Sequence, residues 1–467
     1  MNDTARLAKF VIDTREVPVP VMHAARDALI DTLGCGLAGT LEDTSEIITR
    51  YLRECGGAPQ ATVWGQGFAA TAPDAAFANA VASHALDFDD VHRNVHGHPS
   101  TTLVPALLAV GEQLHTSGTE VLAAYAVGLE VAGKLGEAFG SGHYQRGWHA
   151  TATTGVFASA AACARLMGLS IEQLRHALGL AASQAAGLLR NFGTMTKPFH
   201  AGHAARCGVV AANLAKHGFT ADTSIFDGDN SFLTTYTDGD TLPLGGLLDR
   251  LGQPWEILTP GLSYKRWPCC YCNHRSIGGL LAMIAEHDLK PADIEAIEIV
   301  FPNGSATALI SENPQTGLEG KFSIEYVAAA TLLDRKITLE SFTDVMVQRP
   351  AVRALMAKVQ RVHVDDGNVY SGSTGYNEVK VRSTRGEFTQ RIEKSPGSPA
   401  WPMSEADRDE KFMDCAGRVI GQKAARTLLD LALKCEQLPD VRVLAQATVP
   451  APGVSAQSGA PARVLAT

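Results

Sequence analysis

The stretch from His84 to Pro99 holds the residue types best suited to chemistry in this chain. Its sixteen residues include three aspartates and four histidines but no lysine or glutamate, although only 19% of the whole sequence is charged. Histidine changes its charge near neutral pH, so this composition suits proton transfer, and both residue types also bind metal ions. The stretch therefore predicts either proton-transfer chemistry or a metal site.

Two other segments place titratable side chains at the expected starts of helices. His149 precedes an alanine-rich helical pattern, Lys197 precedes another, and His98 lies just before a third. Helix N-termini attract anions through their free backbone N–H groups, so these ends would form a carboxylate pocket if they converge. Lys265 and Arg266 add two cations at the expected junction of two domains, where pockets are common.

The segment 269–274, Cys-Cys-Tyr-Cys-Asn-His, resembles half of a zinc site. A structural zinc site needs a second ligand pair at a recognisable spacing, and only His203 and Cys207 are candidates for it. We therefore expect buried thiols without a metal ion. We expect proton transfer as the role of the stretch 84–99 as well, because it also lacks a second ligand set, and we expect His92 and His96 to be solvated loop residues.

The glycines at positions 34, 36 and 39 match the dinucleotide-binding fingerprint letter for letter. That fingerprint requires a preceding strand, whereas the residues before Gly34 have helical periodicity. A closely packed helix end is the better interpretation, and we expect no nucleotide or other organic cofactor.

Hydrophobic periodicity predicts two regions of different architecture. Helices are expected at 19–33, 74–88, 101–115, 119–138, 151–166, 171–186 and 199–216, and later at 275–287, 322–334, 339–346 and 404–437; strands are expected at 294–301 and 359–364, with a hairpin at 378–392 around Arg385-Gly386. The fold class is thus mainly α with a smaller α/β domain. We expect a helical domain over 1–262 that is completed by 403–440, an α/β domain over 263–402, and a tail at 441–467 without regular structure.

Composition narrows the class of protein further. The 467 residues are 45% apolar but only 6% aromatic, which favours closely packed helices. A net charge of −9 argues against nucleic acid and anionic membranes as partners, and no apolar run reaches the length of about 18 residues that a transmembrane helix needs. Nine cysteines without a disulfide spacing favour a reducing cytoplasm. We expect a cytoplasmic protein that binds a small molecule.

The motifs together resemble the MmgE/PrpD family, which includes 2-methylcitrate dehydratase, cis-aconitate decarboxylase and iminodisuccinate epimerase. The resemblance covers roughly residues 5 to 438. It rests on His84-Ala-Leu-Asp-Phe-Asp-Asp with His98-Pro99, Gly147-Trp-His149-Ala-Thr, Lys197-Pro-Phe-His-Ala-Gly, Lys265-Arg-Trp-Pro-Cys with His274, Phe322-Ser-Ile-Glu-Tyr326, and Pro402-Met-Ser with Lys411-Phe412. It implies a homodimer, an α/β lid domain inserted into the helical one, and chemistry without a metal or cofactor. The implied pocket residues are Asp87, His98, His149, Lys197, Lys265 and Tyr326, with His274 nearby.

The reactions of this family share the loss of a proton or of CO₂ next to a carboxylate. Lys197 and Lys265 can neutralise the charge that develops there, and His149 can act as the base. His98, held by Asp87, can return a proton to a leaving hydroxyl group. Tyr326 can orient a carboxylate of the substrate or donate a proton.

A choice among the family's reactions depends on two positions. Decarboxylase members are expected to have a threonine near Val91 and a histidine near Cys270, and both are missing here. These absences count against a decarboxylase, and we expect a cofactor-independent, dehydratase-type lyase acting on a hydroxylated di- or tricarboxylic acid of the 2-methylcitrate class. The alternatives are an epimerase of an imino- or amino-dicarboxylate such as iminodisuccinate, a decarboxylase of the cis-aconitate type, and a non-enzymatic polycarboxylate-binding protein.

Overall fold

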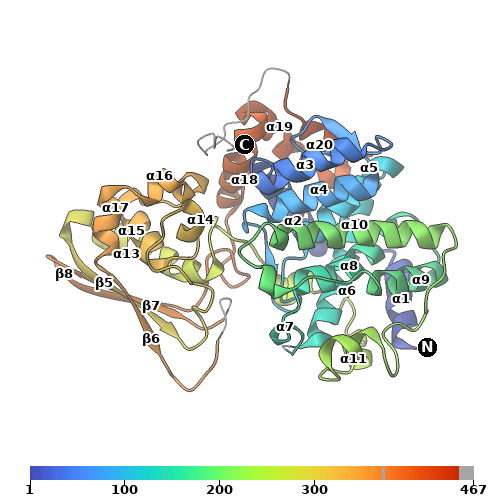
Figure 1. Ribbon diagram of the computed structural model, residues 1–467, viewed down its shortest axis with the longest axis horizontal. Coiled ribbons are helices and arrows are strands. Elements are labelled where there is room, and N and C mark those ends of the chain that lie inside the picture. The colour runs from blue at the N-terminus through green and yellow to red at the C-terminus, as the bar shows by residue number, and fades with distance from the viewer. Residues whose placement is uncertain (141, 371–373, 452–467) are drawn as a thin grey trace. The chain divides into compact units, whose positions relative to one another are not determined.

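The chain divides into two compact units, which a computed structural model describes over residues 1–140, 142–370 and 374–451 (Figure 1). The first unit contains Met1–Leu262 together with the described residues from Arg408 onward, and the second contains Ser263–Asp407. The first is almost entirely helical, and the second combines helices with a four-stranded sheet. The predicted fold class, mainly α with a smaller α/β part, is confirmed.

The first unit is built around the alanine-rich helix α8. This helix is Ala150–Leu166, and all of its residues except the last two are buried. Small side chains let neighbouring helices approach closely, and a helix that is apolar on all sides must lie inside a bundle. Its neighbours are α5 (Ser100–Leu114), α6 (Gly118–Phe139), α9 (Ile171–Ala182) and α10 (Thr196–Lys216).

The remaining elements of the first unit surround this centre. The longer helices are α1 (Asp3–Asp13), α2 (Val19–Gly39), α3 (Asp43–Cys55), α4 (Ala72–Ala85), α18 (Glu405–Ile420) and α19 (Gln422–Ala432). The short elements are α7 (Gly142–Gln145), α11 (Phe232–Thr237), α12 (Leu244–Leu248), α20 (Arg442–Ala447), the strand pair β1 (Ala61–Val63) and β2 (Phe68–Ala70), and β3 (Val91–His92). Strand β4 (Leu262–Ser263) spans the boundary between the units.

The glycines that mimic a dinucleotide fingerprint lie inside the last turns of α2. A Cβ atom on Gly36 would approach the ring of Trp64 to 2.8 Å, and one on Gly39 would approach the carbonyl oxygen of Ala82 to 1.9 Å. The glycines therefore permit close contact between α2 and α4, which confirms the interpretation of a packed helix end.

The second unit has a mixed sheet with the strand order β6-β5-β7-β8. Strand β5 (Ile294–Pro302) pairs in parallel with β6 (Val359–Val364) and antiparallel with β7 (Asn377–Ser383), which forms the predicted hairpin with β8 (Gly386–Ile392). Figure 1 shows the helices of this unit on one face of the sheet. They are α13 (His274–His287), α14 (Gly317–Gly320), α15 (Ile324–Asp334), α16 (Asp344–Val347) and α17 (Pro350–Met356).

Two expectations about regular structure were wrong. The helix expected at 339–346 is a 3-10 turn at Leu339–Phe342 followed by α16, because Thr343 breaks the run and caps the second helix through its side chain. The tail is helical at α20, where Leu444 and Ala445 are buried. Residues 452–467 of the expected tail lie outside the described residues.

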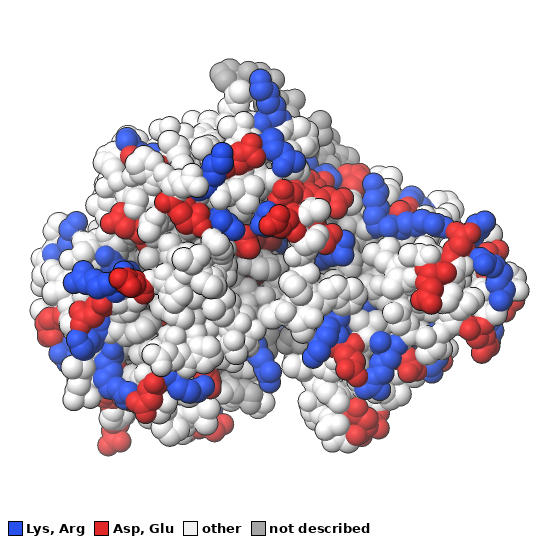
Figure 2. Space-filling model, turned by 180° about the vertical axis from the view of Figure 1, so that it is seen from behind, with Lys and Arg blue, Asp and Glu red and all other residues white. Residues whose placement is uncertain are grey.

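The surface charges, the helix lengths and the cysteines of the structure bear on the partners and the compartment expected from composition. On the face shown in Figure 2, lysine and arginine side chains are interspersed with aspartate and glutamate side chains. None of the helices in the described part of the chain is long and apolar enough to cross a membrane. All nine cysteines are free thiols.

The contact between α2 and α4 gives a test of the helical unit. We expect Gly39→Ala to lower the free energy of unfolding by about 2 kcal/mol or more, because its methyl group would overlap the backbone of Ala82. Gly246→Ala is the matched control, since nothing lies within 4 Å of its Cβ position. Denaturant unfolding of both variants measures the difference, and equal stability would contradict the packing described here.

Candidate active site

The loop that follows α4 carries the centre of the aspartate- and histidine-rich stretch. His84 lies in the last turn of the helix, which ends at Ala85, and Asp87 follows in the left-handed conformation with a φ of 53°. The chain therefore leaves the helix before Asp87, and the expected helix over 74–88 ends three residues early. Aspartate tolerates the left-handed region better than most residues, so this turn needs no glycine.

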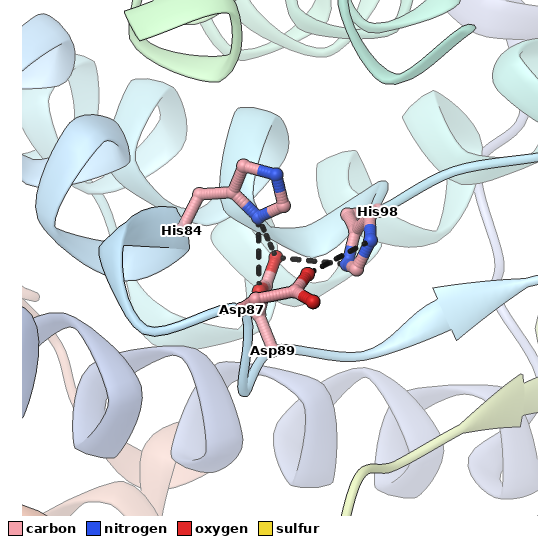
Figure 3. Close-up of side chains that lie close together, drawn as sticks. All are labelled: His84, Asp87, Asp89 and His98. Carbon is pink, nitrogen blue, oxygen red and sulfur yellow. Dashed lines mark hydrogen bonds and ion pairs between the residues drawn. The ribbon is translucent and has the colours of Figure 1, made fainter. Parts of the chain in front are cut away.

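The buried carboxylate of Asp89 lies between two histidine rings (Figure 3). Its two oxygens are 3.0 and 2.9 Å from Nδ1 of His84, and Oδ2 is also 3.2 Å from Nδ1 of His98. Burial opposes ionisation of Asp89, but the two histidines outweigh burial and hold its pKa well below the usual range. The ionised carboxylate therefore accepts from the Nδ1–H of His84, which fixes that ring, while Nδ1 of His98 lies near the same carboxylate.

His84 is neutral at physiological pH because it is completely buried. Burial lowers the pKa of its ring to about 4, the charges of Lys197 and His98 lower it further, and Asp89 opposes the shift. Its Nε2 atom is buried and has no hydrogen-bond partner among the described residues. Figure 3 shows this nitrogen pointing away from Asp89. His84 thus offers a lone pair within the cluster.

Asp87 and Lys197 form the more accessible side of the cluster. The ammonium group of Lys197 is 2.7 Å from Oδ1 of Asp87, and Nε2 of His98 is 3.6 Å from the same oxygen. The side chains of Lys197 and Asp87 are 17% and 21% exposed, and Lys197 also lies over the ring of Phe192 at 5.0 Å. The structure therefore brings three of the predicted site residues, Asp87, His98 and Lys197, into one cluster.

His149 caps the N-terminus of α8 and extends the cluster. Its ring lies 6.1 Å from the His84 ring, and its Nδ1 is 3.1 Å from Nδ1 of His200, so one of these two nitrogens carries a proton. Burial, followed by the charges of His84 and Lys197, lowers the pKa of His149 well below its ordinary value. This neutral, buried imidazole has the properties that its predicted role as a base requires.

The other predicted site residues lie in the second unit, and each is buried. Lys265 is 2% exposed, and His274 and Tyr326 are fully buried. The Tyr326 hydroxyl donates to the carbonyl of Ser341, so it would have to leave that bond to orient a substrate. His274 packs against Trp267, with ring centres 5.3 Å apart. The roles of these three residues stay predictions.

Of the two histidines that we expected to be solvated loop residues, His96 is solvated and His92 is not. His96 is exposed, as expected. His92 is buried, and its Nε2–H donates to the carbonyl of Glu256 at 3.0 Å. The carboxylate of Glu256 also accepts from Lys134 at 2.6 Å. This partner lies 164 residues away in the sequence, so local pattern could not reveal it.

Sequence reasoning missed three members of the cluster. His84 and Asp89 were recognised as titratable but not as a pair, because they pair across the end of a helix at a spacing that no periodic rule covers. His200 lies three residues after Lys197 in α10, so helical spacing alone places both on one face. That signal was available for His200.

Four residues of the cluster have the ligand types of a metal site. One ligand atom each from His84, Asp87, Asp89 and His98 lies within 4.8 Å of the others. The positive charge next to Asp87 is already supplied by Lys197, and Nδ1 of His84 donates to Asp89. The cysteine run 269–272 belongs to no group of three ligands in the described residues, and its thiols are buried. The expectation of metal-free chemistry stays a prediction.

Comparison with known proteins covers nearly the whole chain. The model of the MmgE/PrpD N-terminal domain matches residues 5–244, and that of the MmgE/PrpD C-terminal domain matches residues 267–437. The chain is 32% identical over 436 residues to cis-aconitate decarboxylase of Homo sapiens, covering 91% of this chain and 89% of the relative. It is 27% identical over 459 residues to the enzyme of that name from Aspergillus terreus (strain NIH 2624 / FGSC A1156), covering 92% of each.

The lowered pKa of His84 gives a test of the cluster. In the unfolded chain the ring takes up a proton below pH 6.5, but in the folded protein it does so only near pH 4. Stability is thus fully present above pH 6.5 and is lost as the pH falls toward 4, by about 3 kcal/mol for this one group. We expect His84→Gln to make the decline in unfolding free energy with falling pH shallower.

Urea unfolding at several pH values between 6.5 and 4.5 measures this slope. His217→Gln is the control, because His217 is an exposed residue at the end of α10. An unchanged slope in His84→Gln would contradict the assignment of a neutral, buried His84.

Proposed function

Because the chain belongs to the MmgE/PrpD family, we propose that it is a lyase that forms a carbanion next to a carboxylate of a polycarboxylic acid. The proposal is supported chiefly by one observation, the cluster of neutral histidines beside the paired Lys197 and Asp87. A neutral imidazole can accept a proton, and an ammonium group can stabilise a carboxylate that gains charge. Both requirements of carbanion chemistry are thus met within one group of side chains.

We propose His149 as the base, because burial keeps it unprotonated and the N-terminus of α8 lies at its backbone. Lys197 lies near the same rings and can neutralise the developing charge on the substrate carboxylate. His98 stands between the carboxylates of Asp87 and Asp89 and can hold a proton for delivery. Lys265, His274 and Tyr326 remain proposed contributors from the second unit.

Decarboxylation of an unsaturated tricarboxylic acid of the cis-aconitate type is the first candidate reaction. It is supported by relatives of that name that match about nine-tenths of this chain. In this reaction the C–C bond to one carboxylate breaks, and its electron pair is delocalised into the remaining unsaturated acid. CO₂ leaves, and a proton is delivered to carbon, for which His98 is the proposed donor.

Dehydration of a 2-methylcitrate-type hydroxy acid is the second candidate. It is kept because Val91 and Cys270 count against decarboxylation, since decarboxylase members are expected to carry threonine and histidine at these positions. Here the base removes a proton from carbon, the electron pair forms a C=C bond, and the hydroxyl group leaves as water with a proton from His98. An epimerase of an imino-dicarboxylate would use the same carbanion without losing a group.

We also propose that the protein is a homodimer, as the family resemblance implies.

The substrate can be identified by proton NMR in deuterium oxide. We expect one of cis-aconitate, citrate, 2-methylcitrate, tartrate and iminodisuccinate to be consumed, with loss of CO₂ or water. Prior dialysis against EDTA should leave the rate unchanged, because Lys197 supplies the positive charge at Asp87. Deuterium exchange without loss of a group would indicate the epimerase instead. A rate that falls on dialysis and returns with a divalent cation would contradict the metal-free mechanism.

Two substitutions test the assignment of the site. His149→Ala and Lys197→Ala should each lower kcat/KM at least ~100-fold, the scale of general acid–base catalysis. His217→Ala and Lys216→Ala are matched controls, since both residues lie exposed at the opposite end of α10. Steady-state kinetics with the substrate from the NMR panel provides the measurement. Near-normal turnover in either site variant would show that the assignment is wrong.

A further inference from the structure

A buried lysine from the end of the chain holds the loop that carries Asp87 and Asp89. Lys411 lies in α18, and its ammonium group donates to the carbonyl of Phe88 at 2.9 Å across 323 residues of sequence. The same group is 2.6 Å from Oδ1 of Asp31 in α2 and lies over the Phe88 ring at 4.0 Å. Both side chains of the ion pair are about 5% exposed or less.

The carbonyl that accepts this bond belongs to the residue between the two site aspartates. Asp87 has a left-handed backbone, and Asp89 must then face two histidines, so the peptide between Phe88 and Asp89 has to keep one orientation. Hydrophobic contact is non-directional and cannot orient a carbonyl. A charged donor can, because such hydrogen bonds are short, strong and directional.

The charge on Lys411 is secured by Asp31. Burial opposes that charge, but Asp31 outweighs burial and raises the pKa of the lysine above its ordinary value. Such a buried pair commonly adds little net stability compared with apolar residues of similar size. A contribution to folding stability therefore does not explain why an ion pair, rather than two apolar side chains, occupies this position.

A second anchor fixes the other end of the loop. The backbone N–H and the hydroxyl of Ser100, the first residue of α5, both donate to the carboxyl of Asp90, and the Ser100 oxygen is 2.6 Å from the hydroxyl of Tyr125. Asp90 is therefore tied to the start of α5, whereas Phe88 is tied to α18 and α2. The loop is held on both sides of Asp89.

From this arrangement we infer that Lys411 is a positioning residue for the Asp87–Asp89 loop. Its recorded contacts are with Phe88 and Asp31, so it acts on the loop through the Phe88 carbonyl. The inference rests on the proposed function only in its expected effect on turnover. Its effect on the loop itself is independent of any substrate.

The test replaces the ion pair by apolar groups in the double variant Asp31→Leu, Lys411→Met. This change leaves no buried charge without a partner, so the helices can stay folded while the Phe88 carbonyl loses its donor. We expect amide hydrogen exchange in peptides spanning 86–90 to be about tenfold faster, the scale of one lost charged hydrogen bond. We expect kcat to fall at least ~10-fold, because a displaced catalytic group costs rate.

Arg165→Met is the control for a general loss of stability. Arg165 donates to the carbonyl of Val11 at 2.7 Å and lies at the end of α8 opposite His149. It should lower the melting temperature without changing exchange in 86–90 or kcat. Should the double variant not fold, Lys411→Arg takes its place, because it keeps the charge but changes the donor geometry, and the same exchange measurement applies.

The outcomes separate this inference from the proposed function. Wild-type exchange in 86–90 together with wild-type kcat in the folded variant would overturn the role of Lys411. Faster exchange with no turnover of any acid by the wild-type protein would support the role of Lys411 and overturn the proposed function alone.

Discussion

An ionised carboxylate at full burial is the constraint on which the candidate site depends. Removing the charge of Asp89 from water is costly, and the Nδ1–H of His84, which donates to it, and the nearby ring of His98 offset that cost. The bond to His84 fixes which nitrogen of that ring faces away from the carboxylate. His84 is left with a lone pair on Nε2, and His98 is left with Nε2 directed at Asp87. The tautomer of His84 is therefore set by the carboxylate of Asp89.

The helical unit supplies the geometry that this carboxylate needs. The stretch 84–99 leaves α4 by a left-handed turn and enters α5, while α8 and α10 bring His149 and Lys197 to the same place by their N-terminal ends. Alanine and glycine in these helices allow the close approach that brings short side chains within reach of one another. The charged cluster in the loop therefore depends on the small residues of the bundle, because wider spacing between the helices would separate the histidine rings.

Much of this could be predicted from the sequence, and the remainder has a physical explanation. Periodicity located α8 and α10 and placed His149 and Lys197 at their starts, since these signals are local. The pairing of His84 with Asp89 escaped prediction because it crosses a helix end, where the backbone direction depends on a single φ angle. His92 was misjudged because its partner Glu256 is remote in sequence. Periodicity finds elements, but it does not find contacts between distant segments.

The charges of the first unit's cluster limit how it can receive an anion. Asp87 and Asp89 contribute two negative charges and Lys197 one positive charge, while burial keeps His84 and His149 neutral. The cluster alone would therefore repel a polycarboxylate. The free N–H groups at the starts of α8 and α10, where the helix dipoles are positive, offset part of this repulsion. The same two helix starts carry His149 and Lys197, so the groups proposed to do the chemistry lie where an anion is attracted.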